Sequence, residues 1–157
     1  MTIFRLPAIS FGAVSAIVTS VGLIFGFGAA EFSKPTIIAG LLIAGLADNL
    51  TDSLSIHIYQ ESEKLEQRTA FVATLGNFVV RLFISLSFIV FVLAFSMANA
   101  IAAALTWGVL LLIGLTWAVA RSRAASVSME ILKHLSVAGV VVGVSHITGV
   151  LIHTYAQ

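Results

Sequence analysis

Five long apolar stretches, separated by short polar segments, dominate the pattern of this chain. A helix needs about 20 mostly apolar residues to cross the hydrocarbon core of a bilayer. Stretches of about that length run over residues 8–29, 36–59, 71–95, 99–119 and 135–155. Ser33 and Pro35 suit the N-cap and the first turn of the second helix. The pattern predicts an all-α integral membrane protein, a five-transmembrane-helix bundle that forms a single domain over residues 1–157.

Composition agrees with a membrane protein and excludes several kinds of site. Of the 157 residues, 59% are hydrophobic and only 10% are charged, whereas a soluble domain is about 25% charged. The net charge of +1 gives no electrostatic reason to expect nucleic acid as a partner. The chain has no cysteine, so disulfides, iron–sulfur clusters and thiolate metal sites are excluded. The first apolar stretch could also be a signal peptide, but its length favours a retained helix.

The distribution of basic residues predicts the orientation. Cytoplasmic segments of membrane proteins are enriched in Lys and Arg. If the N-terminus is cytoplasmic, only Lys34 falls outside, and the C-terminus of a five-span chain lies outside. Six basic residues then lie in cytoplasmic segments: Arg5, Lys64, Arg68, Arg121, Arg123 and Lys133. We also expect residues 121–134 to form a cytoplasmic interfacial segment.

Two pairs of glycines have the spacing of helix contacts. Gly22 and Gly26 form one G-x-x-x-G pattern, and Gly139 and Gly143 form another. Such pairs let two helix backbones approach closely. Packing within the chain explains them most simply, and a dimer interface is the alternative.

Three ionisable residues are expected at one level near the middle of the membrane. A helix rises about 1.5 Å per residue, which places Asp48, Arg81 and His146 about 15–16 Å from the same side. The second and third helices form a hairpin, in which facing residues have numbers with a constant sum. Asp48 with Arg81 and Asp52 with Asn77 give the same sum, so we expect these two pairs to face each other. A charge at that depth needs a partner, and the Asp48–Arg81 pair could gate a pathway or merely lock two helices.

The remaining polar residues have simple explanations beside functional ones. His57 lies near the membrane interface, where exposure explains it, and His146 could be a neutral hydrogen-bonded residue or a ligand and proton carrier. The glutamates at 61, 63 and 66 alternate with basic residues and suggest a solvated helix face. No H-E-x-x-H, G-x-S-x-G or P-loop pattern occurs. We therefore expect neither an enzyme nor a permanently bound cofactor.

Several stretches resemble the vacuolar iron transporter family, which includes yeast-type vacuolar iron and manganese carriers and nodulin-like plant members. The resemblance rests on "FGAVSAIVTS" (11–20), "IIAGLLIAGLADNLTDSLS" (37–55) and "ITGVLI" (147–152). It implies five spans with a cytoplasmic N-terminus, a homodimer, and transport of Fe²⁺ or Mn²⁺ out of the cytoplasm. Membership would make this chain a short member, because the family's glutamate-rich cytoplasmic metal-binding domain is absent.

The metal-binding residues of that family are not retained. In the first span the family pattern G-x-x-D-G-x-V-T-T places its metal-binding Asp on Ser15. In the second span the pattern G-L-A-D-A-L-S-M-G-A-G-E-Y matches Asp48 but places its metal-binding Met on Asp52 and its Glu on Ile56. A hard carboxylate therefore stands where the family has a soft thioether, which favours Mn²⁺ or Mg²⁺ over softer ions. Arg81 has no counterpart in these patterns.

These observations lead to one main hypothesis and one alternative. The chain would be a carrier in the bacterial inner membrane that exports a divalent cation, Fe²⁺ or Mn²⁺, by proton antiport, with Arg81 and Asp48 as its charge pair. The expected ligands of the transported cation are Asp52, Asp48, Asn77, Ser15 and His146. Alternatively, the chain is a transport-inactive structural or regulatory membrane subunit whose Asp and Arg residues only pack helices.

Overall fold

Within its described residues, the protein is a bundle of five long helices, one for each predicted apolar stretch. The computed structural model describes residues 6–62 and 67–156. The helices are α1 (Leu6–Ala29), α2 (Lys34–Ser62), α3 (Gln67–Ala94), α4 (Met97–Ser122) and α5 (Val127–Tyr155). The described residues contain no strand, and each helix is long and apolar enough to cross a membrane. The fold is therefore that expected of a five-span integral membrane protein.

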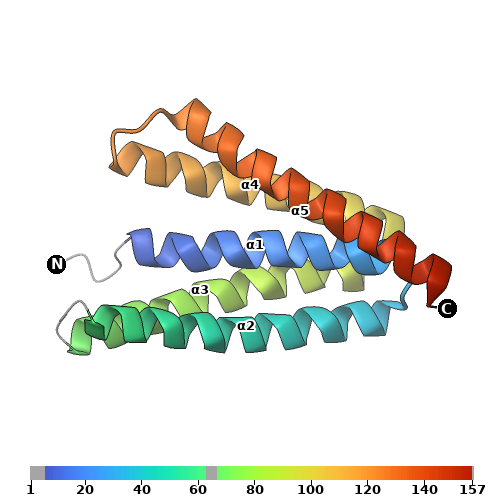
Figure 1. The fold of residues 1–157 in the computed structure, drawn as a ribbon, viewed down its shortest axis with the longest axis horizontal. Coiled ribbons are helices and arrows are strands. Elements are labelled where there is room, and N and C mark those ends of the chain that lie inside the picture. Colours follow the sequence, from blue (N-terminus) through green and yellow to red (C-terminus); the bar gives the residue numbers. More distant parts are fainter. Residues whose placement is uncertain (1–5, 63–66, 157) are drawn as a thin grey trace.

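Helix α1 is the centre of the bundle, because it packs against each of the other four helices. In Figure 1, α1 lies between the α4–α5 pair on one side and the α2–α3 pair on the other. Consecutive helices run in opposite directions, so the start of α1 and the turn between α4 and α5 lie at the same end of the bundle (Figure 1). By the distribution of basic residues, this is the end predicted to be cytoplasmic.

Small residues form most of the buried face of α4, and many large apolar residues lie on the outside of the bundle. On α4 the buried residues recur every four positions and are mostly small: Ala100, Ala104, Gly108, Leu112, Thr116 and Ala120. By contrast, Leu46, Leu50 and Leu54 on α2 and Val140 and Val144 on α5 are exposed. Small side chains let membrane helices approach closely, while large apolar ones suit contact with lipid tails. The chain therefore packs as membrane helices do.

The first pair of predicted contact glycines brings α1 and α5 together. A Cβ atom at Gly22 would lie 3.0 Å from Oγ of Ser145, and one at Gly26 would lie 3.1 Å from its carbonyl oxygen. A Cβ at Gly149 would meet the backbone of Gly26. The intramolecular interpretation of Gly22 and Gly26 is thus confirmed. In contrast, nothing lies within 4 Å of a Cβ at Gly139 or Gly143.

The helix ends differ from expectation at one place. As predicted, Ser33 precedes α2, where its Oγ accepts a hydrogen bond from the Thr36 N–H at 3.4 Å, and Pro35 lies in the first turn. The predicted interfacial segment 121–134, however, is mostly part of α4 and α5, which are separated only by residues 123–126. That segment contains no Gly or Pro to stop a helix. Both helices therefore continue beyond the apolar stretches into the charged residues.

The crossing of α1 and α5 should depend on Gly149. Replacing Gly149 with Leu forces a side chain into the Gly26 backbone, and we expect the free energy of unfolding to fall by about 1–3 kcal/mol, as in other overpacked cores. Gly143→Leu is the matched control on the same helix, because its side chain meets open space. Unfolding in detergent, followed by circular dichroism, measures both variants. Equal stability of the two variants would contradict this packing.

Candidate functional site

Polar side chains of α2 and α3 gather where these two helices face each other near the middle of their lengths. We call this group the polar seam: Asn49, Asp52, Ser53, Asn77, Arg81 and Ser85. On each helix its members recur at intervals of three or four residues, which places them on one face. All except Asp52 are buried. The seam is a polar interior inside a chain whose core is otherwise almost entirely apolar.

An ion pair between the two helices holds the centre of the polar seam. The Nη1 atom of Arg81 donates to Oδ2 of Asp52. The Arg81 side chain is only 3% exposed and that of Asp52 is 28% exposed. Beside this pair, Nδ2 of Asn49 donates to the carbonyl oxygen of Phe78 at 2.8 Å. The buried guanidinium is therefore neutralised, as an arginine at this depth requires.

Several buried atoms of the polar seam have no hydrogen-bond partner among the described residues. Both amide atoms of Asn77, which is 0% exposed, are in this state. The same holds for Oδ1 of Asn49, Oγ of Ser53 and Nε of Arg81. Buried polar groups in folded proteins are nearly always paired, so unpaired ones mark a place where water or a ligand is bound or exchanged. The seam thus offers both donors and acceptors to a guest molecule.

Helix α1 closes the polar seam on its third side, and Gly12 makes this possible. A Cβ atom at Gly12 would meet the side chain of Asn77 and would lie 2.8 Å from Cδ of Arg81. The absence of a side chain at this position lets Asn77 and Arg81 lie directly against the α1 backbone. Gly12 is therefore a packing residue of the seam.

Asp48 is not the direct partner of Arg81, which corrects the predicted pairing. Arg81 pairs with Asp52, one turn further along α2, and Asn77 makes no hydrogen bond to Asp52. Within the described residues, Asp48 makes no hydrogen bond or ion pair, and it is exposed on the surface of the single chain. The constant-sum rule placed the partner of Arg81 one turn too early along α2. It also did not give the rotation of α2, which turns Asn49 toward α3.

Asp48 nevertheless borders the same small space as Arg81. A cavity of about 10 Å³ between α1, α2 and α3 is lined by both residues, together with Thr19, Ser20 and Ser85. This volume corresponds to about one water molecule. Asp48 thus lies at the outer edge of the polar seam, and the Arg81–Asp52 pair lies further inside.

The other predicted site residues lie elsewhere. Ser15 lines a separate cavity between α1, α4 and α5. His146 is exposed on α5, which packs on α1 and α4, while Asp48 and Asp52 are on α2, across α1. The structure therefore does not gather Asp48, Asp52, Asn77, Ser15 and His146 around one point. Among the residues the structure describes, no three His, Asp or Glu side chains are close enough to share a metal ion.

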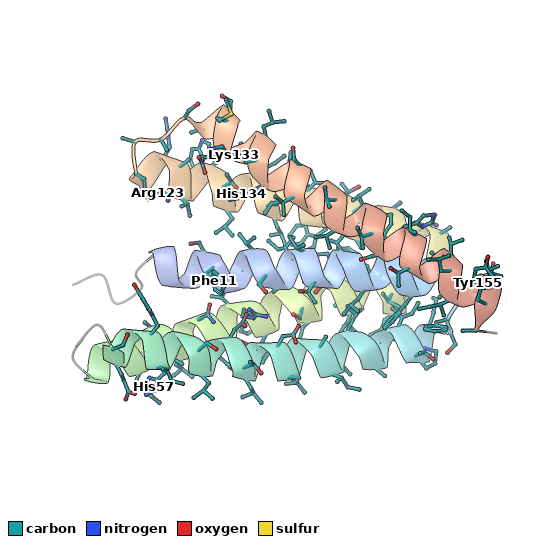
Figure 2. The ribbon with its side chains drawn as sticks, in the orientation of Figure 1. Phe11, His57, Arg123, Lys133, His134 and Tyr155 are labelled. Atoms are coloured by element: carbon teal, nitrogen blue, oxygen red, sulfur yellow. The ribbon has the colours of Figure 1, made fainter. Side chains whose placement is uncertain are left out.

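The histidine near the predicted interface has a local partner. Nε2 of His57 (labelled in Figure 2) lies 3.4 Å from Oε1 of Glu61, one turn further along α2. The His57 side chain is partly buried, so exposure at the membrane interface explains it only in part. Of the glutamates expected on a solvated face, Glu61 is exposed, and those at 63 and 66 fall outside the described residues.

Sequence reasoning missed two parts of this arrangement. Asn49 and Ser53 extend a stripe of four-residue spacing along α2 that begins with the buried Ile37 and Leu41. That spacing was visible in the sequence and gives the rotation of α2 correctly. The second missed feature is a hydrogen bond of 2.9 Å between Oγ1 of Thr116 on α4 and Nδ1 of His134 on α5. No local pattern indicated it, because it joins two helices across their turn.

Comparisons of this chain with protein families, curated proteins and solved structures find no match. The assignment of a function therefore depends on the residues and geometry described above.

The Arg81–Asp52 pair predicts a characteristic pattern of stabilities. Asp52→Asn leaves the buried Arg81 charge unpaired, and we expect a loss of about 3–5 kcal/mol in the free energy of unfolding. The double variant Asp52→Asn with Arg81→Gln contains no charge to bury and should recover most of that loss. Chemical unfolding of the purified variants in detergent measures both. A double variant no more stable than Asp52→Asn would contradict the ion pair.

Proposed function

We propose that this protein is a small membrane carrier that moves a divalent cation, Fe²⁺ or Mn²⁺, out of the cytoplasm in exchange for protons. The observation that carries the proposal is Asp48, an unpaired carboxylate at the midpoint of α2 that borders the same cavity as Arg81. Ionisable residues at such depth are costly and mark ion or proton pathways by default. Asp52, already paired with Arg81, is assigned the role of charge balance instead of primary ligand.

The charges of this group suit an exchange of one divalent cation for two protons. Asp48, Asp52 and Arg81 together carry one net negative charge when both acids are ionised. Addition of a divalent cation, or of two protons, brings the group to the same net positive charge. The electrostatic cost of burying the loaded group is therefore similar in both states. Arg81 lowers the negative charge of the unloaded group from two to one.

The available donor atoms favour a hard cation. Besides the Asp48 carboxylate, the cavity that it borders is lined by the hydroxyl-bearing residues Thr19, Ser20 and Ser85. Carboxylate and other oxygen donors suit a hard cation such as Mn²⁺ better than they suit soft ions. We propose that this chain supplies part of the coordination shell and that a second copy, facing the exposed Asp48, supplies the rest. A homodimer would also shield that carboxylate from lipid. The proposed location is a bacterial inner membrane.

A structural or regulatory role is the alternative function, and it is favoured by the direct bond between Asp52 and Arg81. A structural or regulatory subunit needs only this pair and the Asn49–Phe78 hydrogen bond to fix the register of α2 and α3. In that case the polar seam holds the hairpin together and moves nothing. Asp48 distinguishes the two functions, because within the described part of the chain it makes no hydrogen bond or ion pair that a structural role would require.

Asp48→Asn should abolish transport and leave the fold intact. The substitution removes a charge but breaks no hydrogen bond or ion pair in the described chain. We therefore expect Mn²⁺-dependent flux in reconstituted vesicles to fall to the background of empty vesicles, while the unfolding midpoint stays within the error of the wild type. Proton movement, followed with an entrapped pH dye, should disappear in parallel.

Glu61→Gln is the matched control, since it makes the same chemical change on the same helix, at the exposed end of α2. Its flux should equal that of the wild type. If Asp48→Asn also transports at the wild-type rate, the carrier proposal is wrong and the structural function is favoured.

A variant without the ion pair also distinguishes the two functions, because it removes the charge-balancing residues and leaves Asp48 in place. Asp52→Asn with Arg81→Gln should fold, for the reason given above, but a carrier built on the charge balance of this group should lose proton coupling. A structural subunit has no flux to lose, and its assembly should survive. Comparing Mn²⁺ flux with and without a proton gradient measures the coupling. Coupling that is unaltered in the double variant would count against this role for Arg81.

A further inference from the structure

A second opening into the bundle lies on the opposite side of α1 from the polar seam. It is bordered by α1, α4 and α5, and Figure 1 shows the α4–α5 pair diverging from α1 toward the end that holds the α4–α5 turn. We call this space the hairpin cleft. It consists of two cavities, an outer one of about 600 Å³ and an inner one of about 270 Å³, which share Val18 in their lining. Sites for small molecules have volumes of about 300–1,000 Å³.

The hairpin cleft changes from polar to apolar along its length. Of the described residues that line the cleft, the polar ones all belong to the outer part: Ser10, Ser15, Thr116, Arg123 and His134. The inner part is lined by apolar side chains and glycines, among them Val21, Leu112, Ala138, Gly139 and Val142. This gradient matches a molecule with a polar head and a hydrocarbon tail. A metal ion or a wholly polar solute would gain nothing from the inner part.

The charge at the mouth of the cleft is positive. Arg123 and Lys133 come from the α4–α5 hairpin, and Glu130 is the acid between them (Figure 2 labels Arg123, Lys133 and His134). Lys133 donates to Glu130 at 3.1 Å, whereas the nearest atoms of Arg123 and Glu130 are 3.7 Å apart. Glu130 is thus bonded mainly to Lys133. The Arg123 guanidinium, which has five N–H donors, therefore remains able to bind an anion.

His134 is positioned for the same task. Its Nδ1 is hydrogen-bonded at 2.9 Å to Oγ1 of Thr116, which is only 3% exposed. This bond fixes the ring at the wall of the cleft and leaves Nε2 available to a ligand. When Thr116 donates to Nδ1, Nε2 carries the proton and is a donor. Thr116 is on α4 and His134 on α5, whereas the polar seam consists of residues of α2 and α3, so the seam does not explain this bond.

We propose that the hairpin cleft binds a single-chain amphiphile with an anionic head group, of the fatty-acid type. Arg123 and the Nε2 atom of His134 hold the head group, and the hydrocarbon chain extends along α1 past Val18 into the apolar inner part. A single chain is favoured because the inner part has less than half the volume of the mouth. The position also fits, because Arg121 stacks on Trp117 at 5.0 Å on the same hairpin, and Trp is typical of the membrane–water interface. The proposal does not depend on the carrier function.

Spin-labelled stearic acid tests this proposal. The protein is reconstituted in phosphatidylcholine vesicles at a pH where the carboxylate is ionised, and electron paramagnetic resonance measures the motionally restricted fraction of the probe. Spin-labelled phosphatidylcholine reports the general lipid contact. We expect the stearate to bind in excess over that background and to be displaced by unlabelled oleate.

Two pairs of variants locate the site. Arg123→Gln should weaken stearate binding about tenfold, the effect of one lost charge-assisted hydrogen bond. Arg121→Gln, on the same hairpin but stacked on Trp117, should have no such effect. Gly139→Phe fills the inner part without meeting any atom within 4 Å of its Cβ and should abolish binding. Gly143→Phe meets equally open space but does not line the cleft, so it should bind stearate normally.

Each result supports the proposal or overturns it. Equal restriction of the stearate and phosphatidylcholine probes would show general lipid contact only. Equal effects of Gly139→Phe and Gly143→Phe would place any bound chain outside the cleft. Displacement of the stearate by a two-chain anionic phospholipid as effectively as by oleate would contradict the preference for a single chain.

Discussion

The buried positive charge of Arg81 is the constraint on which the inner structure depends. A guanidinium in the middle of a membrane bundle needs a counter-ion and further hydrogen-bonding groups, and Asp52 supplies the first. The surrounding Asn77, Asn49 and Ser85 make its environment polar, and Gly12 lets α1 pack directly against it. This need keeps α2 and α3 in one register. Because Arg81 pairs with Asp52, Asp48 stays on the outside of the chain. Its carboxylate makes no contact among the described residues that would give it a structural role.

Most of the fold could be predicted from the hydrophobic pattern. Bilayer thickness fixes the length of an apolar stretch, so the five helices were found at the expected places. Packing within the chain was predicted for both glycine pairs from their spacing; Gly22 and Gly26 contact α5, whereas Gly139 and Gly143 have no neighbouring atom within 4 Å of a Cβ. The helices of the α4–α5 hairpin were predicted too short, because hydropathy reports the part of a helix in lipid and not its charged continuation around Arg123 and Glu130.

The candidate site was only partly predictable. Counting along the hairpin placed Asp48 opposite Arg81 and Asp52 opposite Asn77, because helix rise is constant. For the partner of Arg81, which is Asp52, this count was wrong by one turn of α2, and it did not give the rotation of α2. The stripe of Ile37, Leu41, Asn49 and Ser53 contained that information. The separation of Ser15 and His146 from the seam could not be foreseen, because it depends on α1 lying between the two helix pairs.

A structure of the protein soaked with Mn²⁺, with anomalous scattering recorded at the manganese edge, tests the central claim most directly. The account predicts an anomalous peak within bonding distance of the Asp48 carboxylate, at the edge of the seam and in contact with a second copy of the chain. The Arg81–Asp52 pair should remain next to it. A peak found only beside the exposed glutamate at the end of α2, with Asp48 facing lipid, would contradict the carrier and leave the seam as a packing device.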